Sequence, residues 1–263
     1  MAFVHIDHDP ETIGMCLPLN LILPDPSVLR TRALEDFPVL YLLHGLSDDA
    51  SAWPRYSNIE DLANTYGLVV VMPSGGRSIY ADQDNGQAYF TYITEELPAY
   101  LHKLLRLNQT REKTYIAGLS MGGYGAFKAA FLRPELYSAA LSLSGLLVLD
   151  PGMIPPDKAF DPKLMHEMGL VFGGVDKVPG SLNDPVTWLG MIAQNPARFP
   201  RLYMSCGTED DLLGMSRFFA NGLRQVGVAV DYEEHPGGHT WSYWTKHIAV
   251  WLKKVFPLPT PGV

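Results

Sequence analysis

Residues 114–130 read TYIAGLSMGGYGAFKAA, and this stretch decides the fold. It opens with a short apolar run at residues 115–117, which is typical of the end of a buried strand. Apolar and aromatic side chains that recur every three or four residues from Tyr124 onward indicate a helix. Between the two elements, residues 118–122 match the pattern G-x-S-x-G, so we expect a sharp strand-to-helix turn with Ser120 at its corner.

The motif requires glycine at two positions for a steric reason. A strand that turns directly into a helix forces its corner residue into a strained backbone conformation, and side chains two positions away on either side would collide. Gly118 and Gly122 stand at those positions. Ser120 would then project its hydroxyl above the sheet edge, beside the backbone N–H of Met121 at a helix N-terminus. The motif is the nucleophile elbow of α/β-hydrolases, and the flanking strand and helix distinguish it from a glycine-rich turn with a solvated serine.

Composition and charge narrow the class of protein. A chain of 263 residues suits one α/β domain with a sizeable core. The net charge is −8 and no cluster of Lys and Arg occurs, which argues against nucleic acid or an anionic membrane surface as a partner. The first residues lack the pattern of a signal peptide, and no apolar run is long enough for a membrane helix, so we expect a cytoplasmic protein. Cys16 and Cys206 lie in apolar surroundings, and we interpret both as buried free thiols.

Strand and helix patterns alternate from residue 38 to the end of the chain, which predicts a mainly parallel central sheet with helices on both faces. The expected strands of this part are the apolar runs at residues 38–43, 68–72, 115–117, 137–143, 201–205 and 228–233. Two antiparallel strands at residues 3–6 and 13–23 precede them, and Pro18 either breaks the second or places it at an edge.

Two long segments between these elements are expected to be irregular. Residues 77–90 are polar and aromatic, and we interpret them as a surface loop. Residues 146–198 are dense in proline and glycine, with short helical patterns around 161–172 and 185–194. We interpret them as a lid-like insertion in a single α/β-hydrolase domain that spans residues 1–263.

The histidine that would act with Ser120 lies near the end of the chain. A serine hydroxyl is a weak nucleophile that needs a base, and the base needs an acid to orient it, in the chain order Ser, acid, His in this fold. His239 is the expected base, because it lies in a glycine-rich loop after the last strand. His235 at the end of that strand and His247 in the closing helix are the alternatives.

Three consecutive acids follow the strand that ends at Cys206. We expect Asp210 to orient the histidine, because a tight turn after Gly207 would bring the fourth residue inward. Asp211, and then Glu209, remain as alternatives.

The negative charge that develops when a serine attacks a carbonyl requires two backbone donors, which form an oxyanion hole. Met121 is expected to supply one N–H and Leu46, in the loop after the first parallel strand, the other. His44 in that loop is interpreted as a structural residue.

We expect Trp53 and Trp241 to line a substrate pocket. No spacing of residues indicates a metal site or a nucleotide cofactor.

Five sequence blocks, taken together, resemble a known family. They are YLLHGLSDDASAW, VVVMPSGG, GLSMGGYGAFKAA, CGTEDDLL and PGGHTWSYW, and they resemble the esterase D and tributyrin esterase group, which is related to feruloyl and acetyl-xylan esterases and to S-formylglutathione hydrolases. The resemblance spans residues 38 to about 252. It implies a carboxylesterase that acts on short acyl chains of a small-molecule ester without a cofactor, with Ser120, Asp210 and His239 as catalytic triad and Leu46 and Met121 at the oxyanion hole.

The sequence departs from one branch of this group. S-formylglutathione hydrolases usually read G-H-S-M-G-G-H-G-A, whereas this chain has Leu119 and Tyr124 in place of the two histidines. This difference favours the tributyrin esterase branch. An S-formylglutathione hydrolase-type thioesterase, an acyl transferase with the same triad and a feruloyl or acetyl-xylan esterase remain alternatives. A hydrolase fold retained only for binding is disfavoured because all three triad residues are present. The sequence leaves the oligomeric state open, with a homo-oligomer as one option.

Overall fold

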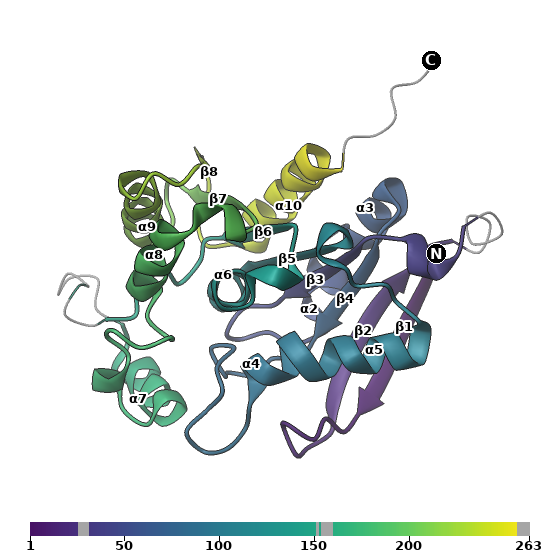
Figure 1. Ribbon diagram of the computed structural model, residues 1–263, viewed down its shortest axis with the longest axis horizontal. Helices are drawn as coiled ribbons and strands as arrows, with labels where there is room; N and C mark the ends of the chain where they lie inside the picture. The colour runs from purple at the N-terminus through teal and green to yellow at the C-terminus, as the bar shows by residue number, and fades with distance from the viewer. Residues whose placement is uncertain (26–31, 151–152, 154–159, 257–263) are drawn as a thin grey trace.

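The computed structural model describes residues 1–25, 32–150, 153 and 160–256. Within them, eight strands form one sheet in the order β1-β2-β4-β3-β5-β6-β7-β8 (Figure 1). The strands are β1 (Ala2–His8), β2 (Leu17–Leu23), β3 (Val39–Leu43), β4 (Val69–Pro73), β5 (Thr114–Leu119), β6 (Ala139–Leu143), β7 (Arg201–Gly207) and β8 (Val230–His235). The first two pairings, β1 with β2 and β2 with β4, are antiparallel, and all others are parallel. The predicted mainly parallel sheet is therefore confirmed.

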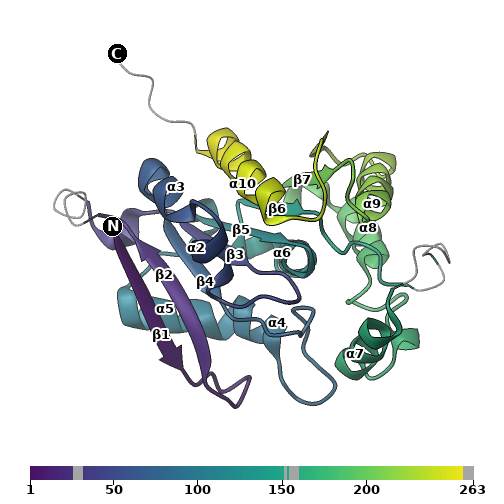
Figure 2. The ribbon, with the colours of Figure 1, turned by 180° about the vertical axis from the view of Figure 1, so that it is seen from behind.

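Helices cover both faces of the sheet (Figures 1 and 2). One face packs against α2 (Ala52–Tyr56), α3 (Ile59–Tyr66) and α10 (Trp241–Val255). The other packs against α5 (Leu97–Leu105), α6 (Met121–Leu132), α8 (Pro185–Gln194) and α9 (Leu213–Gln225). Two further helical segments, α4 (Tyr89–Thr91) and the π-helical η2 (Tyr92–Glu96), continue directly into α5, and α7 (Pro162–Phe172) lies in the insertion.

The central strands are buried on both faces of the sheet, which is why they appear in the sequence as continuous apolar runs. Every residue of β3 is buried, and its side chains alternate between the two apolar layers, with Leu40 and Leu42 in the layer of α10 and Tyr41 in the layer of α6. Because both faces of the strand are covered, the sequence is continuously apolar and does not alternate with polar residues.

Pro18 neither breaks the second strand nor lies at an edge, so that expectation is wrong. It is the second residue of β2, which lies inside the sheet between β1 and β4. Pro18 is tolerated because the pairing with β4 begins only at Leu19, so the missing N–H costs no bond of that ladder. Its carbonyl accepts a hydrogen bond from the N–H of Ser74 at 3.2 Å.

The interpretation of residues 77–90 as a surface loop is also wrong for their first half. Ser78, Ile79, Tyr80 and Ala81 are all buried. The ring of Tyr80 lies so close to two glycines, Gly75 and Gly125, that a Cβ on either would be 2.5 Å from a ring carbon. Polarity along the sequence did not reveal this burial, because it results from contact with α6.

The two cysteines differ from each other. Cys206 is buried at the end of β7, where burial raises the pKa of its thiol to about 12. Cys16 is exposed, so the expectation of two buried thiols is wrong for this residue. Of its apolar neighbours, Leu17 and Leu19 are buried on β2, whereas Cys16 and Met15 precede that strand and are exposed.

The insertion at residues 146–198 contributes to the core. The four residues at its start, Leu146, Leu147, Val148 and Leu149, are buried. Trp188 on α8 is fully buried among the rings of Tyr124, Phe131 and Phe219. The two short helical patterns are confirmed as α7 and α8. The half of the insertion that carries α8 is therefore docked firmly on α6 and α9.

A buried lysine on α6 joins this docked half to the rest of the fold. The Nζ of Lys128 donates to Asn183 Oδ1 at 2.6 Å and to the carbonyl of Tyr80 at 3.4 Å, and it lies 5.0 Å from the centre of the Phe90 ring. Burial lowers the pKa of Lys128 to about 7, an effect that the charge of Asp82 partly opposes. Lys128 therefore links α6 to residues 77–90 and to the insertion, although burying its amine costs free energy.

We predict that Lys128→Met changes how stability depends on pH. The folded-state pKa lies below the usual value of 10.5, so between pH 7 and 10.5 the unfolded chain binds more protons than the folded one. Wild-type stability gains from this group as the pH rises through that window, at ~1.4 kcal/mol per pKa unit, and the variant lacks this gain. The unfolding free energy of the variant relative to wild type should therefore be lower at pH 9.5 than at pH 6.5 by on the order of 2–3 kcal/mol.

Urea unfolding at the two pH values measures this difference. The matched control is Lys103→Met on α5, where the lysine is exposed and no comparable change with pH is expected. Equal behaviour of the two variants would contradict the prediction.

Candidate active site

Ser120 occupies the corner between β5 and α6 in the strained conformation that the motif predicts, with φ 52° and ψ −118°. Close contacts leave no room for side chains beside it. A Cβ at Gly118 would lie 2.2 Å from the carbonyl oxygen of Gly122, and a Cβ at Gly122 would lie 2.5 Å from that of Leu43. The N–H of Ser120 donates to the carbonyl of Leu143 at 2.9 Å, which holds the corner against β6.

The hydroxyl of Ser120 meets a histidine and a buried carboxylate. His239 Nε2 lies 3.0 Å from Ser120 Oγ, and His239 Nδ1 lies 3.0 and 3.1 Å from the two carboxylate oxygens of Asp210. An ionised carboxylate can only accept, so Nδ1 carries the proton and donates it to Asp210. In the neutral ring Nε2 is then the acceptor for the serine hydroxyl. The three residues expected from the sequence therefore lie in one chain of hydrogen bonds.

Asp210 is held in an environment that favours its charged form. Its side chain is fully buried, whereas that of His239 is 34% exposed. Burial would raise the pKa of the carboxyl, but the hydrogen bond and charge of His239, together with the N–H of Leu212 donating at 2.8 Å, lower the pKa below its usual range. Asp210 therefore remains an acceptor that fixes the orientation of the imidazole.

The loop that carries His239 is fastened to the loop of the acid. A Cβ at Gly207 would lie 1.9 Å from the carbonyl of Gly237, which shows how closely the two segments approach. Glu209 donates its N–H to the carbonyl of Gly237 at 3.1 Å and accepts the N–H of Gly237 on its carboxylate. Of the two alternatives for the acid, Glu209 thus binds the backbone of the histidine loop. The carboxylate oxygens 3.0 and 3.1 Å from His239 Nδ1 belong to Asp210 and not to Asp211.

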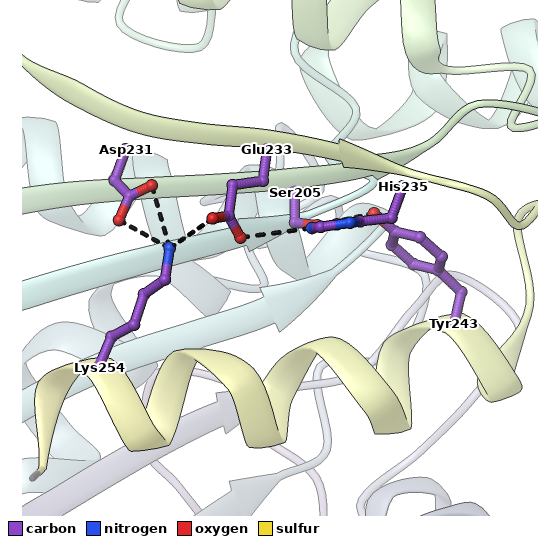
Figure 3. A network of polar contacts seen from close by, with 6 residues as sticks. All are labelled: Ser205, Asp231, Glu233, His235, Tyr243 and Lys254. Carbon is purple, nitrogen blue, oxygen red and sulfur yellow. Dashed lines mark hydrogen bonds and ion pairs between the residues drawn. The ribbon is translucent and has the colours of Figure 1, made fainter.

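The alternative histidines come from β8, whose last residue is His235, and from α10, which carries His247. The rings of His235 and His247 stack at 4.5 Å, and both nitrogens of His247 are buried without a hydrogen-bond partner in the described structure. Burial lowers the pKa of His247 to about 4. Figure 3 shows His235 beside Glu233, whose carboxylate also binds Lys254. The imidazole within hydrogen-bonding distance of Ser120 Oγ is that of His239 and not that of either alternative.

The loop after β3 places Leu46 near the serine. A Cβ at Gly45 would lie 2.8 Å from a methyl carbon of Leu119 and 3.7 Å from Ser120 Cβ, so a side chain there would require Leu119 to shift. His44 fixes the loop, because its Nε2 accepts the N–H of Gly75 at 2.8 Å and its Nδ1 lies 2.7 Å from the carbonyl of Gly45. Burial lowers the pKa of His44 to about 4, so the imidazole that accepts the N–H of Gly75 is neutral.

A cavity of about 240 Å³ opens beside these residues. Its lining consists of Leu46, Ile79, Ser120, Met121, Leu146, Phe160, Leu164, Asp211, Leu212 and His239. Both residues expected at the oxyanion hole are therefore in its wall. Met121 is also the first residue of α6, where backbone N–H groups have no acceptor within the helix.

Trp53 and Trp241 are absent from this wall, and the expectation that they line the pocket is wrong. Trp53 is 1% exposed in the core beneath α2, and its Nε1 donates to the carbonyl of Leu43 at 3.0 Å. Trp241 packs edge-on against Trp53 at 5.0 Å and also lies beside Tyr56. The aromatic group next to His239 is instead Trp244, whose ring is 4.9 Å from that of His239.

Several wall residues were not found from the sequence. Phe160 and Leu164 come from the insertion, Ile79 from the segment expected on the surface, and Leu212 from the start of α9. Beside the cavity, Arg77 forms an ion pair with Glu167 of α7 and donates to the carbonyl of Leu46 at 3.3 Å. No local pattern marks these side chains, because their role depends on which segments meet in space.

Two further observations concern the residues that the structure describes. They contain no group of three or more His, Cys, Asp or Glu side chains arranged to hold a metal ion. No helix among them combines the length and the apolar character that crossing a membrane requires.

The fold and the site together define an α/β-hydrolase of the serine hydrolase class. The model of the family described as "Putative esterase" matches residues 11–255, and the chain belongs to that family of carboxylic ester hydrolases. An acetyl esterase of Caldicellulosiruptor saccharolyticus is 32% identical over 249 residues, which cover 93% of each chain.

Solved structures give the same result. The fluorophosphonate-binding serine hydrolase F of Staphylococcus aureus superposes with a TM-score of 0.86 at 30% identity, covering 97% of this chain and 98% of that one. An S-formylglutathione hydrolase of Staphylococcus aureus superposes with a TM-score of 0.84 at 31% identity and the same coverage. The resemblance to an esterase family that the sequence blocks indicate is confirmed.

Proposed function

We propose that this protein is a serine carboxylesterase that hydrolyses small esters of short acyl chains through an acyl-enzyme on Ser120. The observation that carries the proposal is the chain of hydrogen bonds from Ser120 Oγ through His239 to the buried carboxylate of Asp210. It provides a nucleophile, a base in the correct tautomer and an acid that stabilises the imidazolium formed during the reaction.

The reaction follows from this geometry. Ser120 Oγ attacks the ester carbonyl while His239 Nε2 takes the serine proton, and the N–H groups of Leu46 and Met121 bind the negative oxygen of the tetrahedral intermediate. The intermediate collapses, and the alcohol leaves with the proton from His239. Water then attacks the acyl-enzyme with His239 again as base, which releases the acid and restores Ser120.

The proposed preference for short acyl chains rests on the volume of the cavity and on the side chains that form its wall. Its volume of about 240 Å³ is walled by bulky aliphatic side chains of Leu46, Met121 and Leu146. The 32% identity to an acetyl esterase supports the same choice. The proposal needs no cofactor, and it places the enzyme in the cytoplasm with a small-molecule ester as its partner.

A thioesterase of the S-formylglutathione hydrolase type is a second candidate, favoured by the 31% identity to such an enzyme. The departures at Leu119 and Tyr124 weigh less against it than the sequence suggests. Both side chains are buried, and Tyr124 donates its hydroxyl to the carbonyl of Asn183 at 2.8 Å. Leu119 and Tyr124 therefore affect how the residues beneath the site pack, and this packing does not by itself decide between an ester and a thioester substrate. A feruloyl or acetyl-xylan esterase remains a further alternative, and rates across a panel of these substrates separate the three.

We predict that Ser120→Ala lowers kcat for p-nitrophenyl acetate by on the order of 10⁵–10⁶, because no acyl-enzyme can form. A fluorophosphonate reagent should label the wild-type protein on Ser120, located by mass spectrometry of peptides, and should leave the variant unlabelled. An adduct on Ser47, Ser142 or Ser144 instead would show that the nucleophile is misassigned.

We predict that Asp210→Asn and Asp211→Asn differ strongly. Loss of the buried carboxylate leaves His239 without its orienting partner, and the corresponding change in another triad enzyme costs about 10⁴ in kcat. Asp211→Asn should cost less than about tenfold on a neutral ester, since Asp211 is exposed and the carboxylate oxygens that meet His239 Nδ1 are those of Asp210. Steady-state kinetics on p-nitrophenyl acetate provide the comparison, and the reverse order of effects would identify Asp211 as the acid.

We predict that kcat/KM for p-nitrophenyl esters is highest from acetate to butyrate and falls by octanoate. Methylene groups beyond the cavity would lie partly in water and would not gain the ~0.8 kcal/mol each that burial provides. The measurement is a chain-length series at fixed pH below the micelle concentration of each ester. A maximum at decanoate or longer would reveal a buried acyl tunnel and contradict the short-chain assignment.

A further inference from the structure

Ser144, the residue directly after β6, is fully buried and has a strained backbone. Its φ is 48°, a left-handed value that is uncommon for a residue with a side chain. The N–H of Ser144 donates to the carbonyl of Ser205 on β7 at 2.8 Å, which helps to hold this conformation. Strained residues persist where the surrounding structure fixes them, and they are common beside active sites.

The hydroxyl of Ser144 lies between the indole of Trp244 and the carboxylate of Asp210. Trp244 Nε1 donates to Ser144 Oγ at 3.1 Å, and both residues are buried. Burial would raise the pKa of the Asp210 carboxyl, whereas the hydrogen bond and charge of His239, and to a smaller extent a hydrogen bond from Ser144, lower it. Because an indole N–H can only donate, Ser144 Oγ accepts from Trp244 and keeps its own proton free to donate.

The thiol of Cys206 is a second neighbour of this hydroxyl and a weaker acceptor. Burial raises the pKa of Cys206 to about 12, so its sulfur is neutral at neutral pH. A neutral sulfur accepts hydrogen bonds weakly, whereas the buried carboxylate of Asp210 carries a charge. The single proton of the Ser144 hydroxyl therefore goes to Asp210.

Trp244 connects the same hydroxyl to the imidazole of His239. The two rings are perpendicular, at an interplanar angle of 89°, with their centres 4.9 Å apart. The bond from Nε1 to Ser144 fixes the orientation of the indole, and the indole limits the position of the imidazole on one side. Asp210 limits it at Nδ1. Ser144 thus bonds to both of the side chains that orient His239.

We propose that Ser144 and Trp244 are positioning residues that hold the imidazole of His239 in the orientation needed to accept the serine proton. The inference rests on the proposed esterase function. Neither residue is among the described residues that line the cavity, so substitutions should act on kcat and leave KM nearly unchanged. Loss of the hydroxyl should lower kcat about tenfold, because Asp210 loses one donor and keeps those of His239 and Leu212.

The first test compares two substitutions that remove the same hydroxyl and differ in backbone strain. Ser144→Gly relieves the strain of the positive φ, whereas Ser144→Ala retains it. Both should lower kcat for p-nitrophenyl acetate by about five- to twentyfold, with KM within about twofold of wild type. Urea unfolding should show that the glycine variant is the more stable of the two. Equal losses of kcat at unequal stability separate positioning from structural support.

The second test removes the indole N–H. Trp244→Phe keeps an aromatic ring and lacks the donor to Ser144, and it should lower kcat by about three- to tenfold. In the double variant with Ser144→Gly, the total loss of kcat should be smaller than the product of the two single losses by about threefold or more. The reason is that both substitutions break the same hydrogen bond.

The matched control is another buried hydrogen bond that joins α10 to β7. Ser205 Oγ lies 2.7 Å from the hydroxyl of Tyr243, the residue before Trp244, and Figure 3 shows the two side chains meeting. Ser205→Ala and Tyr243→Phe each remove one of these hydroxyls. Both should lower the free energy of unfolding and change kcat by less than about twofold.

Each outcome decides between the claims. Unchanged kcat in both Ser144 variants, full activity in Ser144→Gly alone, or an equal loss in the control variants overturns the inference, while hydrolysis by the wild-type protein still supports the esterase. Fully multiplicative losses for Ser144→Gly and Trp244→Phe overturn the link between these two residues. If Ser144→Ala fails to fold, Ser144→Gly decides. Failure of the wild-type protein to hydrolyse any p-nitrophenyl ester from acetate to octanoate overturns the proposed function and the inference with it.

Discussion

The close approach of the first turn of α6 to β3 and β5 is the constraint on which the rest of the site depends. It exists only because Gly118 and Gly122 have no side chains, since a Cβ on either would lie within 2.5 Å of a backbone oxygen. The approach forces Ser120 into its strained conformation, and surrounding hydrogen bonds hold it there. It also brings the end of β3 beneath α6, so the loop with Leu46 begins next to Ser120.

A second close contact between glycines positions His239 and Asp210, as the first positions Ser120. Gly207 at the end of β7 and Gly237 after β8 touch backbone to backbone, and Glu209 bonds both ways with the second of these loops. Asp210 and His239 therefore meet through backbone contacts between neighbouring parallel strands. In an α/β sheet the carboxyl ends of the strands share one edge, so short loops are enough to assemble the constellation.

The sequence predicted the features that are encoded locally. β3, β4 and β6 appear as apolar runs because both faces are covered, and the elbow at Ser120 is a short-range steric pattern. The failures concern burial created by distant segments. Tyr80 is buried because Gly125 of α6 leaves space for its ring, and Trp53 is in the core because the carbonyl of Leu43 accepts its N–H. Pro18 could not be judged without knowing where the pairing of β2 with β4 begins.

The two halves of the insertion are attached to different parts of the fold. One half contributes to the stability of the core, and the other contributes to the wall of the cavity beside Ser120. The half with α8 packs on α6 and α9 through Trp188, and it is joined to Lys128 through Asn183. The half with α7 supplies Leu164 to the cavity, and contacts from residues 77–90 help to hold it: the N–H of Asp84 donates to the carbonyl of Val171 at 2.9 Å, and Arg77 pairs with Glu167. Changes in α7 can therefore reshape the cavity wall while the contacts that place Ser120, Asp210 and His239 remain, because none of those contacts runs through α7.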